Sequence, residues 1–130
     1  MYPNDQPTRC KADPAARFPI AYATGTNTNV DITLPAVPNQ CWVIGVGGML
    51  FSYQGGTPSG GIDVSEGAGY TTVFSFDVTS AGFGPVPYHK PLKFKLGEQV
   101  RIRLRDGGAG IVGKLTILDR WLESEPNFAG

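Results

Sequence analysis

The chain has 130 residues, 41% of them hydrophobic, and its eleven Lys and Arg residues balance eleven Asp and Glu residues to a formal net charge of zero. This length predicts one domain with its own core, and the charge balance excludes the strongly basic composition that is typical of nucleic-acid-binding proteins. No apolar run approaches the roughly 20 residues of a membrane-spanning helix, and the 18 glycines and 11 prolines indicate many tight turns.

Residues 1–29 are predicted to form an extended N-terminal arm. Pro3, Pro7, Pro14 and Pro19 exclude a long helix and a central strand. The opening MYPNDQPTRC lacks the apolar segment of a signal peptide. Two interpretations of the arm are open: it lies across its own domain, or it reaches a neighbouring subunit.

The two cysteines, Cys10 and Cys41, are far apart in the sequence. Because no signal peptide is recognised, we expect synthesis in a reducing cytoplasm and free thiols. A disulfide between Cys10 and Cys41 is the alternative.

From residue 30 to residue 123 the pattern is that of short β-strands. In VDITLP, Val30, Ile32 and Leu34 alternate with polar residues, which is the period of a half-buried strand. The sequence therefore predicts an all-β, single-domain, jelly-roll-like antiparallel β-sandwich of about eight strands, with a C-terminal tail at 124–130. The other strand-like segments are QCWVIGVGGMLFSY, GIDVSE, YTTVFSFDVTS, PLKFKL, EQVRIRL and GKLTILDRWLE.

The last segment also fits a helix, because Leu115, Leu118 and Leu122 recur at helical spacing. Thr116 and Ile117 favour a strand. The all-β context decides for a strand.

The segment GAGIVG, at residues 108–113, has the glycine spacing of a dinucleotide-binding loop. That loop binds a pyrophosphate because a helix begins there, whereas here a predicted strand follows. The match to a P-loop also fails, since Leu115 stands where a hydroxyl residue is needed. The segment is interpreted as a flexible hairpin turn whose glycines supply positive φ.

Catalytic and metal-binding patterns are missing from the sequence. His89 is the single histidine and lies among prolines in PVPYHKP, and no GxSxG motif occurs. One histidine and two distant cysteines do not make a zinc site. The sequence predicts a non-enzymatic protein with no catalytic residue, no cofactor and no metal.

A row of cations is the most distinctive feature of the chain. Arg101, Arg103 and Arg105 alternate with apolar residues in EQVRIRL, and Lys93 and Lys95 do so in PLKFKL. If the two segments formed a hairpin, Lys93 would oppose Arg101, and like charges in opposite positions destabilise a sheet. Three arrangements relieve this repulsion: strands in different sheets, screening by water and salt, or acids from another chain.

Arginine at three positions favours a contact role, because its guanidinium forms bidentate contacts with carboxylates and is common at interfaces. The alternative is a solvated outer face that discourages edge pairing. Nucleic acid is the weaker rival, since Tyr88 is the single aromatic residue near the row that could stack on bases.

The chain resembles the small jelly-roll proteins of tailed-bacteriophage virions. The resemblance is carried by the arm, by CWVIGVGGMLFSY, by the glycine-rich loop QGGTPSGG, by VFSFDVTS and by VRIRLRDGGAGIVGKLTI. These proteins include capsid decoration (cement) proteins and fibre knob domains, and the resemblance covers residues 30–122. It implies a homotrimer on the capsid surface that binds the major capsid protein or another virion protein and stabilises the shell, without a membrane or nucleic acid. The expected interface residues are the cations of the two strands and of the arm: Arg101, Arg103, Arg105, Lys93, Lys95, Arg9, Lys11 and Arg17.

A second function of a different class is open. β-Sandwiches also bind glycans through exposed aromatic residues, so the alternative is a carbohydrate- or receptor-binding module of a phage fibre or tail. The candidate aromatic residues near the loops are Tyr53, Tyr70, Phe83 and Tyr88.

Overall fold

The computed structural model describes residues 18–79 and 82–124, which form strands and loops without a helix. This part of the chain therefore contains no helix that could cross a membrane. Its strands, in chain order, are β1 (Ala21–Thr26), β2 (Val30–Leu34), β3 (Gln40–Ile44), β4 (Met49–Gln54), β5 (Gly60–Glu66), β6 (Thr71–Val78), β7 (Gly82–Pro85), β8 (Leu92–Lys93), β9 (Val100–Leu104), β10 (Val112–Ile117) and β11 (Arg120–Ser124).

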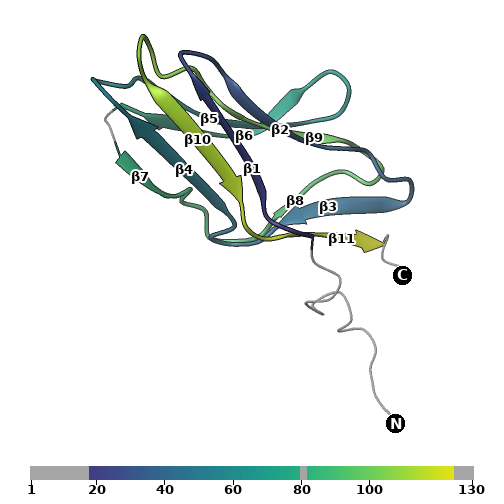
Figure 1. The fold of residues 1–130 in the computed structure, drawn as a ribbon. Helices are drawn as coiled ribbons and strands as arrows, with labels where there is room; N and C mark the ends of the chain where they lie inside the picture. The colour runs from purple at the N-terminus through teal and green to yellow at the C-terminus, as the bar shows by residue number, and fades with distance from the viewer. Residues whose placement is uncertain (1–17, 80–81, 125–130) are drawn as a thin grey trace.

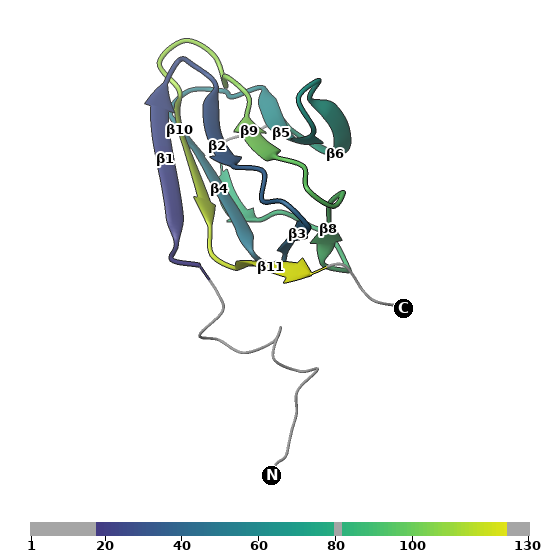
Figure 2. The ribbon, with the colours of Figure 1, turned by 90° about the vertical axis from the view of Figure 1, so that its right-hand side faces the viewer.

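The strands pair in an antiparallel manner and form three sheets. The first sheet has the order β1-β10-β4-β7, the second β2-β9-β5-β6, and the smaller third sheet β11-β3-β8. The first and second sheets form two layers, and the third lies at one end of them (Figures 1 and 2). The prediction of an all-β, antiparallel sandwich is confirmed.

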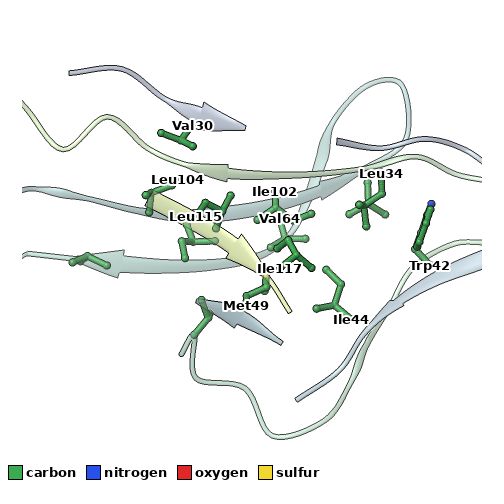
Figure 3. Packing of buried hydrophobic residues seen from close by; sticks show 14 of the residues in the cluster. Val30, Leu34, Trp42, Ile44, Met49, Val64, Ile102, Leu104, Leu115 and Ile117 are labelled. Atoms are coloured by element: carbon green, nitrogen blue, oxygen red, sulfur yellow. The ribbon is translucent and has the colours of Figure 1, made fainter. Parts of the chain in front are cut away.

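One hydrophobic core fills the space between the layers (Figure 3). Ile102 and Leu104 of β9 and Leu115 and Ile117 of β10 are fully buried. Consecutive residues of a strand point to opposite faces, so the apolar alternation of both segments selects the face that each sheet turns inward. At roughly 2 kcal/mol for each buried aliphatic side chain, this burial is the main stabilising contribution.

A buried tyrosine hydroxyl ties the two layers together. The Tyr53 hydroxyl, on β4 of the first sheet, donates to the carbonyl of Arg105 and accepts from the Gly61 N–H at 3.0 Å. Burial raises the pKa of Tyr53. Tyr53 is therefore a structural residue and not a surface contact for a ligand.

The segment predicted as an N-terminal arm contains a strand. Residues 21–26 form β1, which pairs with β10 from Ala21 opposite Ile117 to Thr26 opposite Val112. The prediction that the arm extends to residue 29 is wrong, because Pro19 precedes this strand and does not interrupt it. Residues 1–17 of the arm and residues 125–130 of the predicted tail lie outside the described residues.

The described residues hold eleven strands, where about eight were expected. Part of the excess comes from the last segment, which is confirmed as strand but divides in two. β10 ends at Ile117 in the first sheet, and β11 begins at Arg120 in the third. The chain thus passes from one sheet to another at Leu118 and Asp119.

The predicted clash between Lys93 and Arg101 does not arise. β8, which ends at Lys93, pairs with β3, whereas β9 lies between β2 and β5. Of the three arrangements proposed to relieve the repulsion, the placement of the two segments in different sheets is therefore confirmed.

The glycine-rich segment after β9 connects the second sheet to the first. The interpretation as a hairpin turn is wrong, because β9 and β10 belong to different sheets. The expected positive φ is confirmed at Gly108 (117°) and Gly110 (75°), and the Ile111 N–H donates to the Gly108 carbonyl at 3.1 Å. A strand follows, so this segment does not open a helix as a dinucleotide-binding loop does.

Candidate ligand groove

The outer face of the first sheet carries three rows of side chains, which the strand register sets. Each row runs across the sheet from β1 toward β7. The rows are Tyr22, Thr116, Leu50 and Pro85; then Thr24, Lys114, Ser52 and Phe83; then Thr26, Val112 and Gln54.

An open groove of about 300 Å³ crosses these rows. Tyr22 on β1 is 57% exposed and Phe83 on β7 is 85% exposed, so an aromatic ring stands toward each edge of the sheet. Neighbouring strands lie about 4.8 Å apart, which places β1 and β7 roughly 14 Å from each other. The groove is lined by Tyr22, Leu50, Phe51, Ser52, Gln54, Phe83, Gly84, Lys114 and Thr116.

The floor between the two rings carries both kinds of side chain: Leu50 and Phe51 make its surface mainly apolar, and four polar side chains lie among them. Ser52 and Thr116 supply hydroxyls, Gln54 supplies an amide, and Lys114 supplies an ammonium group. The neighbouring Thr24 hydroxyl donates to the carbonyl of Gly113 at 3.0 Å, which ties β1 to β10 through a side chain as well as through the backbone. The groove therefore offers hydrogen-bonding groups between two apolar surfaces.

The ionisable side chains of the groove lining are Lys114 and Tyr22, and the lining residues include no Asp, Glu, His or Cys. Within residues 18–79 and 82–124, no three His, Cys, Asp or Glu side chains are grouped so that they could hold a metal ion.

The predicted arginine row lies on the outer face of the second sheet, and each arginine contacts a side chain of the same chain. Arg103 forms a bidentate pair with Asp31, with Nε to Oδ1 at 2.7 Å and Nη2 to Oδ2 at 2.8 Å. Arg105 Nε lies 3.1 Å from Asp63 Oδ2, and its Nη2 bonds Asp77. The Arg101 guanidinium stacks over Tyr70, 3.8 Å from the ring centre.

These contacts shift the ionisation of the paired groups. The hydrogen bond from Arg103 holds the pKa of Asp31 below its ordinary value, and the same bond raises the pKa of Arg103. The hydrogen bond to Asp77 raises the pKa of Arg105. Acids from another chain were one of the expected arrangements, whereas the acids observed beside Arg103 and Arg105 belong to the same sheet. An interface role for the row stays a prediction.

The other two predicted interface cations of the described residues lie on β8 and just after it. Lys93 Nζ lies 3.1 Å from Glu123 Oε1 in the third sheet. Lys95 follows β8, and its backbone N–H donates to Glu66 Oε1 at 3.0 Å. The predicted arm contacts fall outside the described residues; they are Arg9, Lys11 and Arg17.

Cys41 carries a free, half-buried thiol that contacts the Glu123 carbonyl at 3.5 Å. Burial raises the pKa of this thiol. Cys10 lies outside the described residues, so the proposed disulfide stays untested.

The aromatic residues predicted as glycan contacts divide into two groups. Tyr53 is buried, and Tyr88 is half-buried with its hydroxyl bonded to the Gly45 carbonyl. Tyr70 is 42% exposed but is covered on one face by Arg101. Phe83 is the member of the set that lines the groove.

Sequence reasoning missed Tyr22 and Lys114. Tyr22 lay in the segment interpreted as an arm, and Lys114 lay at the end of the rejected P-loop match. A signal was present, since Tyr22, Thr24 and Thr26 alternate with small residues, and Lys114 and Thr116 alternate with apolar ones. The proximity of the two strands was not visible in the sequence.

Comparison with solved structures finds a protein described as "CBM4 structure and function". It aligns with 89% of this chain and 99% of its own chain at 12% sequence identity, with a TM-score of 0.39. No protein-family model and no curated protein matches the sequence. The sandwich architecture therefore rests on the strand pairing and the core described above.

Proposed function

We propose that the chain is a non-enzymatic carbohydrate-binding β-sandwich module. The observation that carries the proposal is the mainly apolar groove on the first sheet, with Tyr22 and Phe83 at its two sides and a few hydrogen-bonding side chains between them. This is the second of the two functions that the sequence left open.

The proposal follows from the shape and chemistry of sugars. A pyranose ring has an apolar C–H face, which stacks on an aromatic ring, and hydroxyls at its edge, which need hydrogen-bond partners. Binding sites commonly combine apolar surface with a few placed polar groups. Ser52, Gln54 and Thr116 supply such groups here.

Phe83 provides the strongest argument for a ligand. An aromatic side chain that is 85% exposed contributes little to the stability of the fold. Covering about 100 Å² of such a ring with a sugar would contribute roughly 2.5 kcal/mol of binding free energy. A groove of about 14 Å between its edge strands has room for a chain of sugar rings.

The test is a binding measurement on a panel of neutral and acidic oligosaccharides by titration calorimetry, with F83A and Y22A as variants. We expect each variant to bind at least tenfold more weakly, because each removes one stacking surface. Y70A is the matched control: it removes another exposed aromatic residue, in the turn that precedes β6, and should leave affinity unchanged. If no oligosaccharide of the panel binds the wild-type chain at millimolar concentration, the proposal fails.

The location on a virion, the homotrimer and the contact with a capsid protein stay predictions from the sequence resemblance. The pairing of Arg103 and Arg105 with acids of their own sheet leaves them less available for a capsid partner. For this reason we rank capsid decoration below glycan binding. A native mass measurement tests the trimer.

A further inference from the structure

We propose that the groove selects glycans that carry an anionic group, a carboxylate or a sulfate. This inference rests on the proposed function and adds the class of ligand. Its starting point is Lys114, which lies on the second row of the outer face with Thr24 on one side and Ser52 on the other.

Within the part of the chain that the structure describes, the charge of Lys114 is not paired with an acid. Lys114 is the single charged residue of the groove lining, and the lining contains no carboxylate. Its direct neighbours across β1 and β4 are hydroxyl residues, and no salt bridge joins it to an acid within residues 18–79 and 82–124.

Other strand cations of the described chain differ from Lys114. Lys93 pairs with Glu123, and Arg103 pairs with Asp31. Arg105 pairs with Asp63 and Asp77. Arg101 stacks on the Tyr70 ring, and Arg120 donates to the Pro19 carbonyl. These strand cations therefore each have an acid, a ring or a carbonyl of the chain beside them, whereas the Lys114 ammonium group has no such contact within the described residues. A ligand anion would supply that contact.

The position of Lys114 also suits a stacked sugar. Tyr22 is opposite Thr116, two residues from Lys114 along β10, so the ring and the ammonium group are diagonal neighbours on one face. Phe83 lies two strands away, at about 10 Å. A sugar that stacks on either ring can present its acidic substituent to the Lys114 ammonium group, which the flexible side chain can bring toward it.

The size of the effect follows from the partial burial of the site. Two unit charges attract each other more strongly near a protein surface than in bulk water, because the effective dielectric constant is lower there. Lys114 is half-buried, so we expect a contribution that corresponds to at least a tenfold difference in affinity. Salt should weaken this contribution.

The experiment compares glycans that differ in charge alone. The probes are oligogalacturonate and its methyl ester, alginate, hyaluronate, and dextran with and without sulfation. They are titrated into the wild-type chain, K114Q and K114R at low and high salt. K95Q is the matched control, because it removes one exposed lysine charge outside the groove. Thermal unfolding of each variant verifies that it is folded.

We expect at least one acidic probe to bind tenfold or more tightly than its neutral counterpart. K114Q should abolish that difference, whereas K114R and K95Q should keep it. Carboxylate and sulfate probes distinguish the two anion sources. If neutral probes bind as well as acidic ones, or if K114Q keeps the preference, the inference is wrong and the proposed function stands. If no probe binds, the proposed function fails first.

Discussion

Arg103 occupies the centre of a charged row that crosses the second sheet. The register places Asp31 of β2 on one side of it and Asp63 of β5 on the other. Ser75 of β6 extends the row, since its hydroxyl donates to Asp63 Oδ1 at 2.7 Å. Opposite charges in facing positions each contribute about 0.2–1 kcal/mol, so the row stabilises this register of the four strands.

The pairing of Asp31 predicts an acid-sensitive contribution to stability. Arg103 lowers the pKa of Asp31 in the folded chain, while an unfolded aspartate titrates near about 3.9. Protonation therefore favours the unfolded chain. The stabilisation is complete above roughly pH 5, and it is lost as the pH falls from about 4 through the folded-state pKa.

We expect D31N to lower the free energy of unfolding by about 1 kcal/mol at pH 7, because the bidentate pair is partly exposed and lies at the upper end for surface ion pairs. The difference from wild type should disappear near pH 2. Urea unfolding followed by tryptophan fluorescence measures both values. In an R103M background D31N should have little effect, and an equal loss in both backgrounds would contradict the pairing.

For a single residue, the sequence predicts which face of the sheet its side chain occupies, but not which side chains it contacts. The alternation in EQVRIRL places the arginines on the outer face, as observed. The partner of Arg103 is 72 residues earlier in the chain, and only the sheet order brings the two together. Lys114 shows the same limit, because its neighbours Thr24 and Ser52 come from distant strands.

At the scale of elements, the connection from β9 to β10 combines a turn conformation that depends on local sequence with a strand pairing that depends on distant contacts. Glycines that need positive φ are predictable from composition, and Gly108 and Gly110 adopt it. The destination of the chain after the turn is not predictable in this way. Whether β10 pairs with β9 or joins the opposite layer depends on contacts with β1 and β4, which lie far away in the sequence.

We expect G110A to lower the free energy of unfolding by about 1 kcal/mol, because a left-handed conformation strains any residue with a Cβ atom. Space is not the cause, since a Cβ at Gly110 would meet no atom within 4 Å. Gly69 is the matched control: it is equally open but lacks the left-handed φ. G69A should leave stability unchanged or slightly higher. Equal losses in the two variants would refute the strain argument.

In the whole molecule, contacts at the junction between the first and third sheets hold the two together. The sequence indicated the sandwich, but it did not indicate a third sheet or the strand within the predicted arm. Both depend on where the chain leaves one sheet for another. Such a crossing occurs between β10 and β11, and the segment before β1 lies against it: the Phe18 N–H donates to the Arg120 carbonyl at 3.3 Å.

Arg120 is the side chain that fastens this junction. Its Nη1 donates to the Pro19 carbonyl at 2.9 Å, and its guanidinium lies 5.3 Å from the Phe18 ring and 6.0 Å from the Trp42 ring. Phe18 and Trp42 contact each other at 4.9 Å between ring centres. Burial lowers the pKa of Arg120. Arg120 of the third sheet thereby fixes the position of residues 18–19, which lead into β1 of the first sheet.

We expect R120A to lower the free energy of unfolding by about 1–2 kcal/mol, the sum of a hydrogen bond to a charged group and a cation–π contact. Removing the guanidinium also exposes one side of Trp42, so the fluorescence maximum of the folded chain should move to longer wavelength.

R101A is the control, because Arg101 also covers an aromatic ring, that of Tyr70, but joins no two sheets. It should cost less than about 0.5 kcal/mol, as most surface substitutions do. Urea unfolding and emission spectra of the two variants test whether Arg120 joins the first and third sheets. Similar losses with an unchanged spectrum would mean that Arg120 does not join the sheets.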